Sequence, residues 1–433
     1  MEKKAKIDQT ILVFKEIVER HNIGLPEEGF PKKPIRKLIQ FFQSISDARV
    51  QKKIEYPLHE IIMVAFLAVM AGACTFVDIA NFGSINQEWL KKNFYIKHGI
   101  PSHDTFRRIL SIISPQQLQK ATVVFLLDNI KVIKRAFNIK SEGMKQYCVD
   151  GKVSRGTGRL KGLEREVRQM QVLNVYDRTD GICIVSKVID DKTNEIPVAQ
   201  DILKMLDLKG AIVSFDALHA QHATVAVVTE QKGDYVVSVK GNQPELQEEI
   251  KTFFTQKRLA SIESGMSNYY ESKEKSHNRI ETRKYYLSTN VSWLVDLDAW
   301  KGLKSIIYYT LHTEDVNSGK VTDEVHYYIS SMKNVILCAD AIRGHWSVEN
   351  QLHWHLDVNY MDDNMEIIDR TAAQNFGLLK KMALSLHKLI APLLKCSVRS
   401  SKIHIGWNVK ALIAMFRALD EDIIAEAMSN VKA

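Results

Sequence analysis

The spacing of apolar residues changes at Tyr147, and this change limits most strongly what the chain can fold into. From Ile35 to about Phe137, apolar residues recur at the three- and four-residue spacing of helices. From Tyr147 onward there are three short strand-like segments, followed by alternating helical and strand-like segments as far as Val239. The sequence therefore predicts an all-helical region followed by an α/β region.

The second region has the order β-β-β-α-β-α-β. Its second and third strands flank a turn that ends at Gly181, which predicts a hairpin, and the later strands alternate with helices as parallel strands do. Among the topologies that short connections allow, this order fits an RNase H-like mixed sheet. After Gly241 the alternation lapses into strand-like pieces until a helical pattern resumes near Ala339, which predicts a β-rich insertion.

These patterns divide the chain into six parts. They are an N-terminal extension with one amphipathic helix at 9–20 (1–34), a helical domain that binds DNA or assists binding (35–137), the first part of the RNase H-like core (145–243), the β-rich insertion (244–336), the second part of the core (337–395) and a helical C-terminal tail (396–433). We see no internal repeat.

The net charge and the cysteines of the chain indicate what kind of partner it binds and in which cellular compartment it lies. A net charge of +8 favours a polyanionic partner. Five singly scattered cysteines support neither a disulfide framework nor a CxxC metal site, and the charged N-terminus lacks the apolar core of a signal peptide. The uncharged run Ile61–Val77 is short for a membrane span and has acidic flanks, so we expect a buried helix. We therefore predict a cytoplasmic protein without a membrane partner.

Two aspartates follow directly after predicted strands. Asp150 ends the first strand and Asp216 ends the fourth, and functional groups of open sheets gather at the carboxyl ends of strands. Each aspartate alone could simply form a turn. If the two strands are neighbours, however, both carboxylates cannot ionise at short range without a cation. A divalent metal ion would resolve that conflict.

Glu349 is the third candidate acid. Helical spacing places it on one face with Ile342 and Leu352, within an apolar stripe. A buried carboxylate needs a partner, and a salt bridge to Arg343 or Lys380 would supply one. The functional alternative is that Glu349 completes a carboxylate cluster for Mg²⁺, which prefers oxygen ligands.

A zinc site is the rival metal hypothesis. It would use His345, His353 and His355 with Asp357, supplemented by His219 and His222. We disfavour it because residues two apart on one helix point to different faces, so His353 and His355 cannot both ligate simply.

Basic residues gather in four segments. Residues 152–168 carry six basic and two acidic residues among several glycines without a P-loop motif, which suits a phosphodiester backbone or a solvated loop. Residues 103–113 follow a helix cap at Ser102 and resemble a recognition helix or an ordinary solvated helix. The polar run 276–283 could contact phosphate or form a hairpin edge. Residues 370–402 carry seven basic residues and no acid, which indicates a DNA track or a helix with one wet face.

Several motifs together resemble the H-repeat-associated insertion-sequence transposases over roughly residues 38–390. The motifs are Val149-Asp-Gly-Lys152, Ser214-Phe-Asp-Ala217, Val239-Lys-Gly-Asn-Gln243, His277-Asn-Arg-Ile-Glu-Thr-Arg283 and Arg343-Gly-His-Trp-Ser-Val-Glu-Asn350. Their number and order make the resemblance specific.

The resemblance implies a DDE transposase with an RNase H-like core, in which Asp150, Asp216 and Glu349 bind metal and catalyse DNA cleavage and strand transfer. We expect two Mg²⁺ ions about 3.5–4 Å apart, replaceable by Mn²⁺. Expected partners are double-stranded DNA of the element ends and target, and further copies of the chain, in the nucleoid of a bacterial cytoplasm. The alternatives are an RNase H-like nuclease without strand transfer and a domesticated DNA-binding protein without catalysis.

Fourteen residues are predicted to contact DNA. They are Arg107, Arg108, Lys152, Arg155, Arg159, His277, Arg279, Arg283, Arg343, His345, Trp346, Lys380, Lys381 and Lys388.

Overall fold

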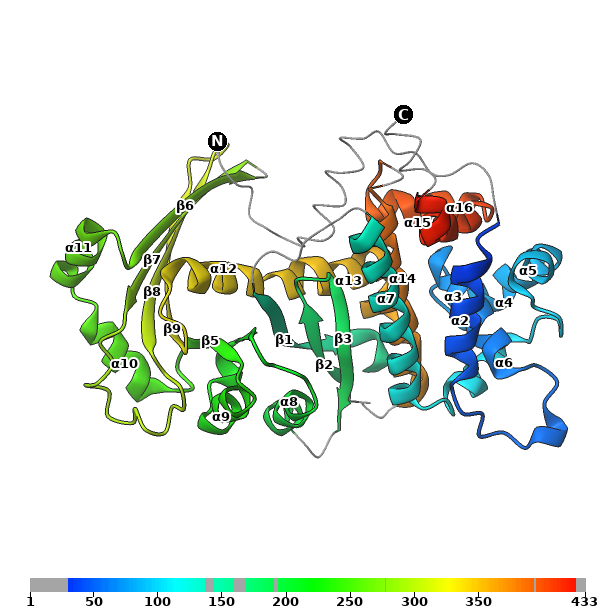
Figure 1. Cartoon of the computed structure of the whole chain (residues 1–433), viewed down its shortest axis with the longest axis horizontal. Helices are drawn as coiled ribbons and strands as arrows, with labels where there is room; N and C mark the ends of the chain where they lie inside the picture. Colours follow the sequence, from blue (N-terminus) through cyan, green and yellow to red (C-terminus); the bar gives the residue numbers. More distant parts are fainter. Residues whose placement is uncertain are drawn as a thin grey trace. The chain divides into compact units, whose positions relative to one another are not determined.

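The computed structural model describes residues 30–136, 144–158, 168–190, 194–276, 278–392 and 395–425 (Figure 1). The predicted helix at 9–20 lies outside these residues. Chain contacts divide the described residues into two compact units. The first unit contains 144–150 and 194–348, apart from residue 277, and the second contains the other described residues.

The strands form a mixed sheet in the order β3-β2-β1-β4-β5-β9-β8-β7-β6. Its first five strands in the chain, with the helices between them, are β1 (Lys145–Ser154), β2 (Met170–Asp177), β3 (Ile182–Ile189), α8 (Glu195–Lys204), β4 (Ala211–Phe215), α9 (His222–Glu230) and β5 (Asp234–Val239). This is the predicted order β-β-β-α-β-α-β, and β2 and β3 form the expected antiparallel hairpin. The expectation of a mixed α/β fold is confirmed.

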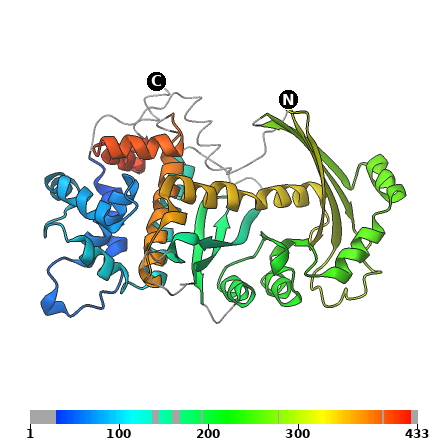
Figure 2. The same cartoon turned by 180° about the vertical axis from the view of Figure 1, so that it is seen from behind.

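The central strands of the first unit are parallel to one another. Strand β1 pairs in parallel with β4, and β4 with β5. Every residue of β4 is buried, as its continuous apolar sequence predicts for a central parallel strand. Helices α8 and α9 lie side by side in Figure 1, and α12 (Val335–His345) packs on the sheet through a cluster that includes Ile212 and Val236 (Figure 2).

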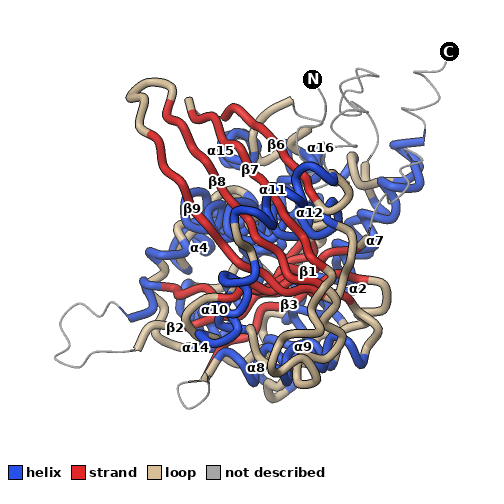
Figure 3. The backbone as a smooth tube through the Cα atoms, turned by 90° about the vertical axis from the view of Figure 1, so that its left-hand side faces the viewer, coloured by secondary structure: helices blue, strands red, loops and turns tan. Residues whose placement is uncertain are grey.

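The predicted β-rich insertion contains four strands but begins with two helices that the sequence patterns did not indicate. Its elements are α10 (Pro244–Phe253), α11 (Gln256–Gly265), β6 (Tyr269–Ser276), β7 (Arg279–Ser288), β8 (Ser305–Asp315) and β9 (Val321–Ser330), and the strands run together in Figure 3. One tyrosine from each strand aligns in a single cross-strand row, Tyr269, Tyr286, Tyr308 and Tyr327. Such aromatic pairs stabilise antiparallel sheets.

The second unit is mainly helical. Its helices before β1 are α2 (Lys32–Gln43), α3 (Leu58–Met70), α4 (Phe76–Ile85), α5 (Gln87–Phe94), α6 (His103–Leu110) and α7 (Pro115–Ala136). Its later elements are a π-helix at Val348–His353 that begins one residue before the unit, α13 (Trp354–Tyr360), α14 (Arg370–Ile390), α15 (Val398–Trp407) and α16 (Ala411–Arg417).

Helix α14 is the centre of this unit and packs against α3, α6, α7 and α15. Helix α3 is buried along nearly its whole length, as expected for the uncharged run Ile61–Val77 that it overlaps. The helix ends at Met70, however, and the end of the run belongs to α4, where Val77 is exposed. None of the helices in the described part of the chain is long and apolar enough to cross a membrane.

Candidate active site

Asp150 and Asp216 lie on neighbouring parallel strands, but only Asp216 directly follows its strand. The prediction that Asp150 ends the first strand is wrong, because β1 continues to Ser154 beyond its last residue paired with β4, Val149. The register of β1 and β4 pairs Val149 with Phe215, so the two aspartates occupy the next position on each strand. Neighbouring strands are about 4.8 Å apart, which brings the two residues together as predicted. Asp216 also caps the short helix after β4, where its Oδ1 accepts a hydrogen bond of 3.1 Å from the Leu218 amide. Burial raises the pKa of Asp216, because it disfavours the charged carboxylate.

Glu349 lies in the π-helix that follows α12, and the predicted buried position is wrong. Its side chain is 57% exposed, whereas Ile342 and Leu352 are buried. A π-helix adds a residue to the turn and so rotates the following side chains around the axis. The sequence-based prediction assumed a regular α-helix with 3.6 residues per turn, which places Glu349 on the apolar face. The π-helix rotates Glu349 away from that face. Neither Arg343 nor Lys380, the predicted salt-bridge partners, is paired with it in the described contacts.

The partner of Glu349 is His353, one helical turn away. His353 Nδ1 lies 3.0 Å from Glu349 Oε2, and its Nε2 lies 3.1 Å from Asn174 Nδ2. The hydrogen bond with His353 is the main reason that the pKa of Glu349 is lowered, against the opposing effect of burial. From the sequence, His353 was a candidate only for the zinc site. The four-residue spacing from Glu349 was the signal that could have identified the pair.

Glu349 and His353 are arranged as possible metal ligands within the second unit. Both could offer an atom to the same ion, because His353 Nδ1 and Glu349 Oε2 lie 3.0 Å apart. A carboxylate with an imidazole and no thiolate suits a hard or borderline divalent cation.

Replacing His353 by alanine should raise the pKa of Glu349 toward its ordinary value, because the main cause of its lowering is removed. Ionised Glu349 and its hydrogen bond are favoured above the lowered pKa and are lost as the pH falls through it. A carboxyl-carbon NMR titration would measure the midpoint. An unchanged midpoint in the folded variant would contradict the role assigned to His353.

The exposed members of the predicted DNA-binding set are Arg107, Arg108, Arg155, Arg279 and Trp346. Arg107 and Arg108 belong to α6, which begins after Ser102 as predicted, with the serine hydroxyl accepting a hydrogen bond from the Thr105 amide. His345 Nδ1 lies 3.1 Å from the Ser214 hydroxyl. Arg159 and His277 lie outside the described residues.

Three predicted DNA-binding lysines lie inside the second unit, which contradicts the prediction of a DNA track along this helix. Lys380, Lys381 and Lys388 of α14 are 0%, 9% and 4% exposed. Lys380 Nζ lies 3.3 Å from Asp362 Oδ1, and Lys388 Nζ donates to the Tyr176 hydroxyl at 3.1 Å. The helix is surrounded by other helices, so Lys380 pairs with an internal carboxylate and Lys388 with an internal hydroxyl group instead of facing solvent.

Two further members of the predicted DNA-binding set, Arg283 and Lys152, form ion pairs within the protein, and Arg343 lies near an acidic residue. Arg283 is buried and paired with Glu274 at 3.0 Å and with Glu281. The Lys152 ammonium contacts Asp357 at 2.6 Å. Burial lowers the pKa of Lys152, but the hydrogen bond to Asp357 and nearby aspartates outweigh it and raise the pKa overall. Arg343 is partly buried and lies 3.6 Å from Glu274.

Comparisons with known proteins agree with the motifs. The model of the "Transposase DDE domain" matches residues 141–386, and that described as "DDE_Tnp_1-associated" matches 39–126. YbfL of Escherichia coli strain K12 is 31% identical over 358 residues, which cover 81% of this chain and 90% of YbfL. The "H repeat-associated putative transposase YhhI" of the same strain gives the same values. A piggyBac transposase synaptic complex with hairpin DNA aligns with 98% of this chain and 84% of its own, at 12% identity and a TM-score of 0.38, too slight a likeness to support a shared fold.

Proposed function

This chain belongs to the transposase DDE domain family, and from that premise we propose that it cuts DNA at the ends of an insertion sequence and joins them to target DNA. The observation that carries the proposal is that Asp150 and Asp216 each come directly after the last residue pair of the neighbouring strands β1 and β4, Val149 with Phe215. The pair of Glu349 with His353 supports the proposal. The strand order β3-β2-β1-β4-β5 supports an RNase H-like core around these residues.

In this proposal Asp150, Asp216 and Glu349 hold divalent cations. The raised pKa of Asp216 supports this assignment, because a carboxylate that burial destabilises gains most from a nearby positive charge. His353 holds the Glu349 carboxylate in place by its hydrogen bond. Bound Mg²⁺ or Mn²⁺ would activate the attacking water or 3′-hydroxyl and stabilise the leaving oxygen.

Purified protein incubated with Mg²⁺ and DNA carrying the ends of its own element tests this function. Joined products are expected. Nicked products alone would indicate the nuclease alternative, and bound but uncut DNA would indicate a binding protein. Calorimetric titration with Mn²⁺ measures metal binding separately from cleavage, and should detect a site that Asp150→Asn weakens.

We assign recognition of the element ends to the helical region 35–137, whose α6 exposes Arg107 and Arg108. Replacing both arginines by alanine should reduce the preference for the ends over random DNA, since a good contact of arginine with a base edge contributes ~1–3 kcal/mol of discrimination. A competition binding assay measures this preference. An unchanged preference would move recognition to another part of the chain.

A further inference from the structure

The turn Lys240–Gln243 lies beside the turn that carries Asp216. It follows β5 as the Asp216 turn follows β4, and these parallel strands pair Phe215 with Val237. The Gln243 amide donates to the Lys240 carbonyl at 2.9 Å and closes the turn. Both turns therefore stand at the same carboxyl edge of the sheet, where ligands of open sheets bind.

Two side chains tie these turns together. Asn242 Nδ2 donates to the Ala217 carbonyl at 2.5 Å, and Gln243 Nε2 donates to the Ala220 carbonyl at 2.8 Å. These carbonyls lie on either side of His219, which is buried and 2.9 Å from Glu195 at the start of α8. The Asp216 turn is thus held from both sides, and a group bound at Lys240–Gln243 would keep a fixed spacing from Asp216.

The outer part of the turn is open to a partner. Lys240, Gly241 and Asn242 are exposed. A Cβ atom added at Gly241 would meet nothing within 4 Å, and the residue is not in the positive-φ region that favours glycine. Neither packing nor backbone conformation within the described residues requires this glycine. The absence of a side chain at Gly241 leaves room for a ligand to approach the backbone closely.

We propose that Lys240–Gln243 is a phosphate-binding turn for the DNA cut beside Asp216, an inference that rests on the proposed function. The Lys240 ammonium binds a phosphate of the backbone, and Gly241 leaves room for the sugar-phosphate chain to approach. Asn242 and Gln243 are positioning residues, which fix the distance between that phosphate and Asp216. No base is read at this turn, so the contact is independent of DNA sequence.

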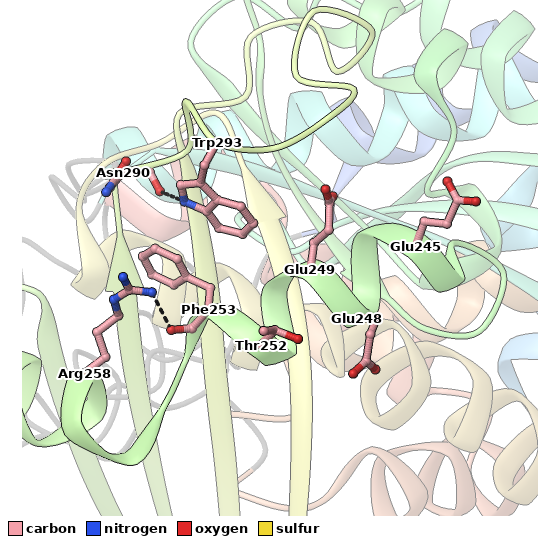
Figure 4. Close-up of a pocket in the computed structure, with 8 residues that line it drawn as sticks. All are labelled: Glu245, Glu248, Glu249, Thr252, Phe253, Arg258, Asn290 and Trp293. Atoms are coloured by element: carbon pink, nitrogen blue, oxygen red, sulfur yellow. Dashed lines mark hydrogen bonds between the residues drawn. The ribbon is translucent and has the colours of Figure 1, made fainter.

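A neighbouring cavity of about 590 Å³ is the competing place for DNA, and its charge argues against it. The cavity lies against α10 (Figure 4), and its lining includes Glu245, Glu248 and Glu249 with a single cation, Arg258. Phe253 and Trp293 stack there with ring centres 4.8 Å apart. Three carboxylates repel phosphates at short range, and Lys240 is not among the lining residues.

Salt-dependent binding of a double-stranded oligonucleotide of arbitrary sequence, measured without divalent metal, tests the Lys240 contact. Lys240→Gln should flatten the slope of log affinity against log salt by about 0.9, the value for one lost phosphate contact. Lys257→Gln, at an exposed lysine of α11, is the matched control and should leave the slope unchanged. Equal slopes for Lys240→Gln and wild type would overturn the proposal.

A second pair of variants tests the glycine. Gly241→Leu should weaken DNA binding without lowering the thermal midpoint, because its side chain enters open space in the free protein. Gly265→Leu is the control, since a Cβ there also meets nothing within 4 Å. Equal DNA affinities for both variants would contradict a close approach at Gly241.

The positioning role predicts a separation of binding from catalysis. The double variant Asn242→Ala with Gln243→Ala should keep the affinity for DNA and the thermal midpoint but lower kcat, because the Asp216 turn loses two bonds that orient it. An unchanged kcat would remove the positioning role. If wild-type protein failed to cut DNA with Mg²⁺, the proposed function would fail, whereas a normal salt slope in Lys240→Gln with active wild type would overturn only this inference.

Discussion

Asp150→Asn should lower the rate of DNA cleavage about a thousandfold, which corresponds to a loss of ~4 kcal/mol of transition-state stabilisation. Asparagine keeps the shape of the side chain on β1 but removes the charge that a divalent cation requires. Asp216→Asn and Glu349→Gln should have effects of the same order, because each removes a carboxylate from the proposed metal site. Single-turnover cleavage of end-bearing DNA in Mg²⁺ measures all three.

The matched control is Asp298→Asn, at an exposed aspartate of the same unit as Asp150 and Asp216. It removes the same charge from the protein surface and should cut at the wild-type rate. DNA binding without metal should stay close to wild type in every variant, which separates loss of chemistry from loss of substrate. A carboxylate variant that cuts at near the wild-type rate would be excluded from the metal site.

The sequence predicted the sheet well because central parallel strands carry a strong local signal. The five residues of β4 are all apolar or small, and the chain turns directly after them at Asp216. The hairpin of β2 and β3 was likewise marked by its turn at Gly181, which has a positive φ of 69°. Asp216 could therefore be placed at a strand end from sequence alone, whereas the end of β1 was predicted four residues too early, at Asp150 instead of Ser154.

Glu349 and α10 were harder for different reasons. Glu349 lies in a π-helix, which departs from the regular helical period, so that period misplaces its side chain. Helix α10 does carry a signal, with Pro244 in its first turn and apolar residues at 246, 250 and 253 that are buried. The helical pattern was missed because glutamates separate the apolar residues of α10 and because the rest of the segment was predicted to be rich in strands.

The lysines of α14 show the limit of reading charge from sequence. A basic run without acidic residues predicts lysines that face solvent. A buried lysine can, however, be paired with an acid that is distant in the sequence. Asp362, the partner of Lys380, lies eighteen residues before it in the chain. Burial raises the pKa of Asp362, yet Lys380, Lys381 and Lys152 outweigh burial and hold that pKa below its usual value. The stability that this ionised group contributes is present above its unfolded pKa and is lost as the pH falls through its folded pKa.

Lys380→Met should therefore destabilise the protein by about 3–5 kcal/mol, the usual cost of leaving one member of a buried ion pair uncompensated. Lys131→Met is the matched control on α7, since Lys131 is 71% exposed and 3.9 Å from Asp128, and such exposed pairs contribute only about 0–1 kcal/mol. Denaturant unfolding followed by circular dichroism measures both.

Adding Asp362→Asn to Lys380→Met should recover part of the lost stability, because the buried charge is then removed together with its partner. Measuring both the unfolding of Lys380→Met and the salt dependence of its DNA binding decides whether the basic run 370–402 neutralises internal charge or contacts DNA. A lysine that neutralises Asp362 affects unfolding and leaves the salt dependence of DNA binding unchanged. A folded Lys380→Met protein of normal stability, with a salt slope flatter by about 0.9, would instead restore the predicted DNA track along α14.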